Sequence, residues 1–208
     1  MLKPEPAFLC LLGSSYPADG FVDKELMARL GNRFIPYSAF IARHMDGTHV
    51  SKESLRLTAL QAELARHAER SVVIVGRSSG AIVAARAAAM GCPQIAAIIA
   101  LGYPFEHPDR GDEPKRYRHL PRVSVPFLIF QGERDRYCTP DGITRYALSE
   151  STLICPVNAD HAFRLAPDSW DEVAHRITAL AEADAQDDLT ELTLRIGRPP
   201  KEHKAKAG

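Results

Sequence analysis

A serine flanked by glycines follows the most apolar segment of this chain. Residues 76–80 read Gly-Arg-Ser-Ser-Gly, end the apolar run 71–76 and open an alanine-rich segment. A tight strand-to-helix turn between small residues lifts a serine hydroxyl out of a sheet, and the helix N-terminus behind it favours an oxyanion. Ser78 is therefore the predicted nucleophile. Ser79 competes for that role, but only Ser78 has glycines two residues to either side.

A serine hydroxyl needs a base, usually a histidine that a carboxylate orients. Asp135 follows the apolar run 125–130, and His161 follows the apolar run 151–157. Nucleophile, acid and histidine thus come in the chain order that accompanies a Gly-x-Ser-x-Gly turn. We expect these three residues to form a catalytic triad.

Each candidate also has a structural alternative. Ser78 could cap a helix in an ordinary turn, and Asp135 could be a turn or cap residue. Glu133 is a rival acid, and Asp160 could simply shape the loop before His161. The ordered combination of turn, aspartate and histidine favours the triad. Ser79 is well placed to lend its backbone N–H to an oxyanion hole.

Three further residues are candidates for substrate contact. Tyr103 and Phe105 follow an apolar run at 94–102 and could line an acyl pocket, although Phe105 could equally pack in the core. Arg77 could contact a substrate carboxylate or lie on the surface. The polar excursion 106–122 is too short for a large hydrophobic lid, which disfavours a lipase for long-chain fats.

Apolar runs alternate with segments of helical spacing along the chain. The predicted strands are 7–12, 33–37, 71–76, 94–102, 125–130 and 151–157, and the predicted helices are 23–30, 51–68, 80–90, 140–148 and 168–183. Because proline has no backbone N–H to donate, Pro36 places its predicted strand at an edge of the sheet. Apolar strands separated by helices predict an α/β protein: a three-layer αβα sandwich around a mostly parallel sheet of about six strands. Such sheets bind ligands beyond the carboxyl ends of their strands.

Length and charge narrow the class of protein. The chain has 208 residues and equal numbers, 26 each, of basic and acidic side chains, which argues against a nucleic-acid partner. No apolar run is long enough to span a membrane, and the first one is too short for a signal peptide. Residues 1–184 are expected to form one domain, followed by a flexible tail, 185–208, in which Leu192, Leu194 and Ile196 could form a short strand.

The spacing of the cysteines bears on metal binding, disulfide bonds and cellular location. The four cysteines, Cys10, Cys92, Cys138 and Cys155, lie far apart, which disfavours zinc or a disulfide framework and fits a cytoplasmic location. Nothing in the sequence specifies the oligomeric state.

The sequence resembles the α/β-hydrolase superfamily, in particular its small members with little cap domain. It is similar to dienelactone-hydrolase-like proteins and to short esterases or thioesterases. The resemblance rests on Gly76-Arg77-Ser78-Ser79-Gly80, on Gln131-Gly132-Glu133-Arg134-Asp135 with Pro140, and on Ala159-Asp160-His161-Ala162-Phe163.

This resemblance implies a reduced α/β-hydrolase fold. It also implies a serine nucleophile at Ser78, an acid at Asp135, a base at His161 and an oxyanion donor at the Ser79 amide. Dienelactone hydrolases proper use a cysteine nucleophile, so their activity is not carried over. Many members have a His-Gly pair where this chain has Leu12-Gly13-Ser14-Ser15, and Ser14 is the expected second oxyanion donor.

The predicted function is hydrolysis of a small ester or thioester through an acyl-enzyme intermediate on Ser78. The expected partner is a small-molecule acyl substrate, and the chemistry requires no metal or organic cofactor. Two alternatives stay open: a non-catalytic binding or scaffold protein with this fold, and a peptidase or acyltransferase that uses the same triad.

Overall fold

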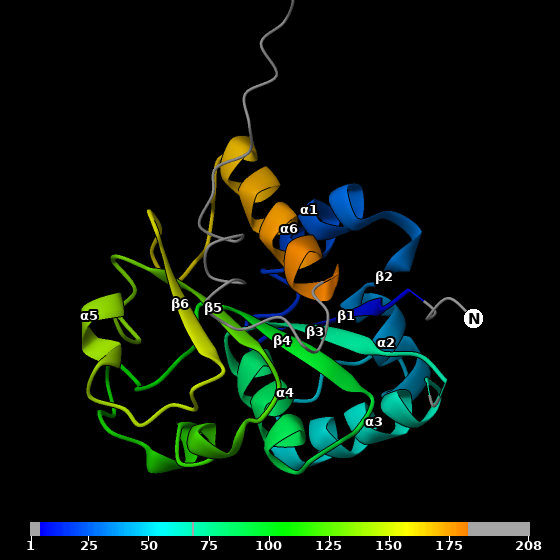
Figure 1. The fold of residues 1–208 in the computed structure, drawn as a ribbon, viewed down its shortest axis with the longest axis horizontal. Coiled ribbons are helices and arrows are strands. Elements are labelled where there is room, and N and C mark those ends of the chain that lie inside the picture. Colours follow the sequence, from blue (N-terminus) through cyan, green and yellow to red (C-terminus); the bar gives the residue numbers. More distant parts are fainter. Residues whose placement is uncertain (1–4, 68, 183–208) are drawn as a thin grey trace, which may run out of the picture.

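Six strands form one sheet in the order β2-β1-β3-β4-β5-β6 (Figure 1). The computed structural model describes residues 5–67 and 69–182, so the predicted tail 185–208 lies outside the described residues. The strands are β1 (Ala7–Leu11), β2 (Phe34–Ile35), β3 (Val72–Arg77), β4 (Ile95–Leu101), β5 (Phe127–Gly132) and β6 (Thr152–Val157). Every pairing between these neighbours is parallel, which confirms the predicted α/β class and six-stranded sheet.

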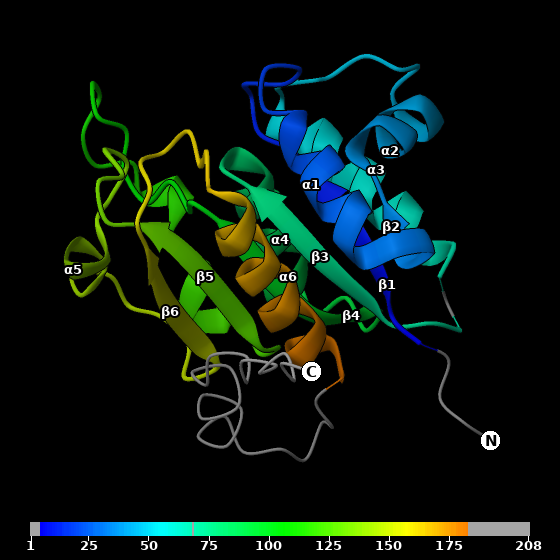
Figure 2. The same ribbon diagram turned by 90° about the horizontal axis from the view of Figure 1, so that it is seen from above.

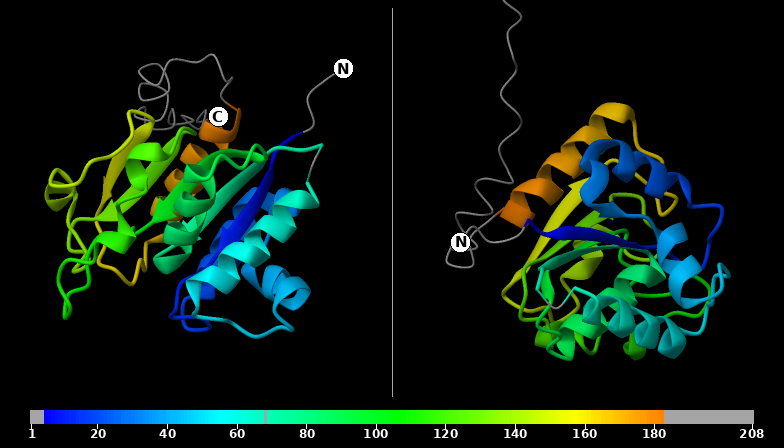
Figure 3. Two further views of the ribbon diagram at one scale, coloured as in Figure 1. Left: turned by 90° about the horizontal axis from the view of Figure 1, so that it is seen from below. Right: turned by 90° about the vertical axis from the view of Figure 1, so that its right-hand side faces the viewer.

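Helices cover both faces of the sheet and make three layers (Figures 2 and 3). One face carries α1 (Phe21–Leu30) and α6 (Pro167–Glu182), which contact each other, and the other carries α3 (Glu53–Ala65) and α4 (Ser79–Ala89). The remaining helical elements are α2 (Tyr37–His44), the single turn α5 (Pro140–Ile143) and the short 3-10 turns η1 (Gly31–Arg33), η2 (Pro114–Arg116) and η3 (Leu120–Arg122). No helix in the described ranges is both long and apolar enough to cross a bilayer.

The central strands explain why the sheet forms. The side chains of β3 from Val72 to Val75 have no exposed surface, and neither do those of β4 from Ile98 to Leu101. Leu9, Ile74 and Ile98 lie in register across β1, β3 and β4. Burial of each such side chain contributes about 1.5–3 kcal/mol, and β-branched residues suit a pleated surface with helices on both sides.

Helix α2 was not predicted from the sequence, and it shortens the strand expected at 33–37. Pro36 ends the two-residue edge strand β2, and Tyr37 begins the helix. The carboxylate of Asp23, far away in α1, accepts hydrogen bonds from the backbone N–H groups of Tyr37 (3.0 Å) and Ser38 (3.4 Å). This carboxylate therefore caps α2 from another helix, a contact that no local pattern reveals.

Two other elements also differ from expectation. Helix α5 ends at Ile143 rather than continuing to residue 148. Strand β6 was expected to be buried, but most of its side chains are half-exposed, because it forms the other edge of the sheet.

Candidate active site

The elbow after β3 places Ser78 in a conformation that few residues other than glycine adopt. Its backbone φ is 50° and ψ is −123°, between the end of β3 and the first turn of α4. A side chain at Gly76 would lie 2.5 Å from the Ala81 Cα atom, and one at Gly80 would collide with the Leu11 carbonyl. Both glycines therefore allow the close approach that holds Ser78 in this strained position.

A chain of hydrogen bonds runs from Ser78 to a buried carboxylate. Ser78 Oγ lies 3.0 Å from His161 Nε2. On the other side of the ring, His161 Nδ1 lies 2.8 Å from Asp135 Oδ2 and 2.9 Å from Oδ1. The parallel sheet brings these residues together because β3, β5 and β6 all end at the same edge. Within such a chain, the imidazole can take a proton from the hydroxyl while the carboxylate fixes the ring.

Asp135 is held by two groups besides the histidine. It is 1% exposed and accepts hydrogen bonds from Gln131 Nε2 (3.0 Å) and from the backbone N–H of Tyr137 (2.8 Å). The same Gln131 amide also donates to the Cys138 carbonyl (2.7 Å). These bonds fix the orientation of the carboxylate relative to the His161 ring. The rival acid Glu133 is exposed, and Asp160 accepts a bond from the Ala162 N–H (2.9 Å) in its own loop.

Burial lowers the pKa of His161 below its usual value, and the positive charge of Arg77 acts in the same direction. The hydrogen bond to Asp135 opposes both effects without reversing them. This direction favours the neutral imidazole, which is the form that a general base needs. The ring of Tyr137 packs against that of His161 with 4.0 Å between centroids.

Arg77 is 4% exposed, so the surface position considered for it is wrong. Its guanidinium donates to the Leu101 carbonyl (3.1 Å) and to the His161 carbonyl, and it lies over the Phe163 ring. These contacts connect the end of β4 to the histidine loop. Arg77 thus supports the position of His161, and its role as a substrate contact stays a prediction.

The segment after β1 packs against the elbow. A side chain at Gly13 would lie 3.0 Å from Ser78 Cβ, so this backbone borders Ser78. Ser79 Oγ accepts a hydrogen bond from the Ser14 N–H (3.1 Å) and contacts Ser14 Oγ (3.1 Å). Both predicted oxyanion residues therefore lie beside Ser78, with the Ser14 amide directed at the Ser79 hydroxyl.

A buried arginine fixes this loop from the side of α3. Arg56 is 2% exposed and donates to Ser79 Oγ (3.1 Å) and to the Leu12 carbonyl. The two bonds join the loop after β1 to the first turn of α4. A guanidinium can make both at once because its donors form a rigid fork.

Comparison with known proteins agrees with this fold. Residues 42–186 match the family model of an alpha/beta hydrolase domain. The chain belongs to this alpha/beta hydrolase family. A search of curated proteins found no match.

Solved structures of other alpha/beta hydrolases superimpose on most of this chain. Est1E from Butyrivibrio proteoclasticus is 13% identical with a TM-score of 0.59, over 88% of this chain and 90% of its own. The esterase domain of a Rhodothermus marinus protein is 14% identical (TM-score 0.56, 83% and 85% covered). The thioesterase domain from the curacin biosynthetic pathway is 12% identical (TM-score 0.60, 85% and 92% covered). At these identities, the likeness concerns the fold.

Tyr103 and Phe105 lie in the core of this alpha/beta hydrolase. Neither side chain has exposed surface, and their rings contact each other with 4.7 Å between centroids. The Tyr103 hydroxyl donates to the Arg116 carbonyl (2.5 Å). Core packing, the alternative considered for Phe105, describes both rings in this structure, and their role in a substrate pocket stays a prediction.

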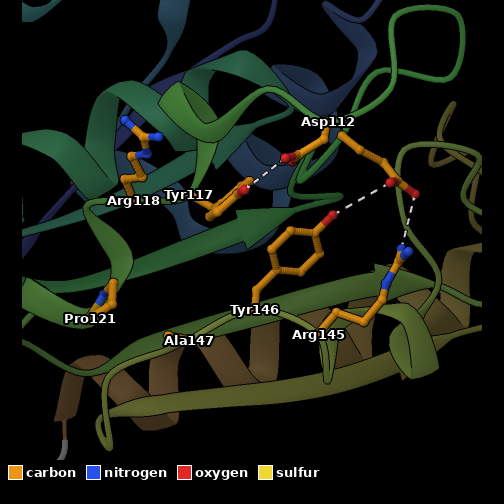
Figure 4. Close-up of a pocket in the computed structure, with 8 residues that line it drawn as sticks. Asp112, Tyr117, Arg118, Pro121, Arg145, Tyr146 and Ala147 are labelled. Atoms are coloured by element: carbon orange, nitrogen blue, oxygen red, sulfur yellow. Dashed lines mark hydrogen bonds and ion pairs between the residues drawn. The ribbon is translucent and has the colours of Figure 1, made fainter.

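A hollow of about 420 Å³ lies between the 106–122 excursion and residues 145–147, which follow α5 (Figure 4). Its acidic side chains are occupied by neighbours. Glu106 pairs with Arg145 (3.3 Å), and Asp112 accepts a bond from the Tyr117 hydroxyl (3.1 Å). These contacts therefore stabilise the conformation of the excursion.

Arg56, Gln131 and the internal contacts of Arg77 were not predicted from the sequence. All three are polar side chains with almost no exposed surface that bond to backbone carbonyls or to the residues above. A signal existed for Arg77 and Gln131, since each lies in the last two positions of an otherwise apolar strand. Within the described ranges, no cluster of three or more His, Cys, Asp or Glu side chains could hold a metal ion.

Proposed function

We propose that this protein is a serine hydrolase that cleaves a small ester or thioester through Ser78, His161 and Asp135. The observation that carries the proposal is the chain of hydrogen bonds from Asp135 through His161 to Ser78 Oγ, on a strained elbow at the carboxyl edge of the sheet. Membership of the alpha/beta hydrolase family supports it.

In the proposed mechanism, His161 Nε2 removes the proton from Ser78 Oγ as the oxygen attacks the acyl carbonyl carbon. The tetrahedral intermediate collapses, and the leaving alcohol or thiol takes the proton from His161. Water then attacks the acyl-enzyme, gives its proton to His161, and releases the acid as that proton returns to Ser78. Asp135 holds the imidazole in the tautomer that these steps need.

The carbonyl oxygen becomes an oxyanion, and backbone amides would stabilise it. The Ser79 N–H lies in the first turn of α4, where no side chain caps the helix, so it is one proposed donor. The second proposed donor is the Ser14 amide, which must exchange its present bond to Ser79 Oγ for the substrate. The positive end of α4 adds to this stabilisation.

One feature of the structure supports a small substrate, and another supports a cytoplasmic location. The excursion between β4 and β5 contains only the short turns η2 and η3, which gives little surface to cover a long acyl chain. All four cysteines are free thiols, as in a reducing compartment.

Labelling with a serine-reactive fluorophosphonate tests the proposal. Wild-type protein and Ser79→Ala should be labelled, whereas Ser78→Ala should not. The Ser79→Ala variant is the matched control because it removes the neighbouring hydroxyl and leaves the nucleophile. Equal labelling of Ser78→Ala and wild type would exclude Ser78 as the nucleophile.

A further inference from the structure

A small pocket adjoins the elbow on the side of α3 and α4. Its volume is about 160 Å³, and its walls include Ser51, Glu53, Arg56, Ser79, Lys115 and Arg116. Ser79 is the chain neighbour of the proposed nucleophile, so the pocket begins one residue from it. A water molecule takes about 30 Å³ in the liquid, so there is room for a compact polar group but not for a long chain.

Basic side chains outnumber acidic ones in this pocket. Lys115 (3.1 Å) and Arg116 (2.6 Å) share a single carboxylate, that of Glu113. The wall residue Glu53 already faces Arg86, at 2.5 Å. Arg56 forms no ion pair with any residue that the structure describes. The pocket therefore has an excess of positive charge, although the charges of the whole chain balance.

Arg56 is the most deeply buried of these cations. Two of its nitrogens bond to the Ser79 hydroxyl and the Leu12 carbonyl, but its Nε has no hydrogen-bond partner among the described residues. Both acceptors are uncharged oxygens. Burial lowers the pKa of this guanidinium from its usual value, and the nearby groups of Tyr37, Glu53 and Asp19 oppose this effect without reversing it. An anion nearby would favour the charged form that burial disfavours.

Helices α3 and α4 pack against each other (Figure 1), and the first residue of each lines this pocket. Glu53 is the first residue of α3 and Ser79 the first of α4, and no side chain caps either helix. Uncapped N-terminal N–H groups and the positive ends of two helix dipoles favour an anion. Buried Arg56, exposed Lys115 and both helix ends thus point to the same kind of ligand.

We propose that this pocket binds a compact oxyanion on the substrate, a carboxylate or a phosphate, close to the scissile carbonyl. The protein would then prefer anionic esters or thioesters to neutral ones. This inference rests on the proposed function for its link to catalysis, whereas the anion site itself can be tested without turnover.

The first test compares two substrates of similar length, 4-nitrophenyl hemisuccinate and the neutral 4-nitrophenyl butyrate. The measured quantity is the ratio of their kcat/KM values. Wild type should favour the hemisuccinate, and Lys115→Met should lower the ratio about threefold, the size expected for one exposed charge. Lys24→Met, which removes an exposed lysine from α1 on the opposite face, should leave the ratio unchanged. The same ratio in Lys115→Met and Lys24→Met would overturn the inference.

Inorganic phosphate separates the two sources of the anion. Competitive inhibition by phosphate that weakens in Lys115→Met, with no preference for the hemisuccinate, would assign the site to a phosphate group. Preference for the hemisuccinate without phosphate inhibition would assign it to a carboxylate. Purely non-competitive inhibition, with no substrate preference, would overturn the placement of the pocket in the substrate site.

Binding of succinate and phosphate to Ser78→Ala, measured by titration calorimetry, keeps the two proposals apart. Anion binding that depends on Lys115, in a wild-type protein that hydrolyses neither ester, would refute the hydrolase function and retain the site. Hydrolysis of the butyrate ester with no anion binding would refute the site and retain the function.

Discussion

Gln131 joins the Asp135 carboxylate to the core, and its removal tests whether the candidate triad depends on that network. The side chain has no exposed surface. It donates to Asp135 Oδ2 (3.0 Å) and to the Cys138 carbonyl (2.7 Å), and its oxygen accepts from the Tyr103 N–H (3.0 Å). One amide thus satisfies three buried polar groups.

Gln131→Leu keeps a similar volume and leaves the Tyr103 N–H and the Cys138 carbonyl without this partner. Each unsatisfied buried group costs about 1–3 kcal/mol, so the free energy of unfolding should fall by roughly 2–6 kcal/mol. Asp135 loses one charge-assisted bond, and kcat should fall by about tenfold or more as the carboxylate loosens. Urea denaturation and ester hydrolysis measure the two effects. The control is Gln61→Leu, at an exposed position of α3, which should change stability by less than about 0.5 kcal/mol.

Gln131→Glu adds a pH test to the same network. Two carboxylates this close do not both ionise readily, so burial and the charge of Asp135 raise the pKa of the new glutamate above its unfolded value. An acid whose pKa is raised on folding destabilises the protein as pH rises above the unfolded value. The difference in Tm from wild type should therefore grow from pH 5 to pH 8. A difference that is constant with pH, or a Gln131→Leu variant as stable as Gln61→Leu, would refute this account of the network.

Two further predictions concern charge. Arg77→Met should raise the pKa of His161 and so move the acid limb of the pH profile of kcat/KM to higher pH. Arg77→Lys keeps the positive charge and should leave this limb in place. An acid limb that does not move in Arg77→Met would contradict the prediction. Burial acts to raise the pKa of Glu63, but its hydrogen bonds to His44 and Arg43 (2.5 Å each) and to His67 outweigh burial and lower that pKa from 4.5 to about 2. Glu63→Gln should therefore cost about 3 kcal/mol at pH 7, measured by urea denaturation, and a difference that did not shrink between about pH 5 and pH 2 would contradict the charge argument.

The parallel sheet and the placement of Ser78, Asp135 and His161 after three of its strands could be predicted from the sequence for one reason. Each residue lies in the turn or loop after a run of apolar residues, and parallel strands that cross over through helices must end at the same edge. The prediction needed only the type of each element and its order in the chain. Boundaries shifted by several residues, as in α5, changed nothing in the site.

Helix α2 shows what local pattern cannot supply. Its buried residues Tyr37, Phe40 and Ile41 have helical spacing, which was a usable signal. The preceding Phe34–Ile35 and Pro36 nevertheless suggest an edge strand with equal force. Asp23 resolves the competition by capping the helix, and that contact exists only once α1 has packed.

The supporting residues of the site were missed for a different reason. Arg56, Arg77 and Gln131 bond mainly to backbone carbonyls, whose positions depend on the folded loops rather than on any residue type. Hydrophobic periodicity registers such a side chain only as an interruption of an apolar run. In a buried strand that interruption is informative, because a polar group there must find a partner inside the protein. The end of a buried parallel strand is also where such sheets bind ligands, so a polar residue at that position indicates support for a site before its partners are known.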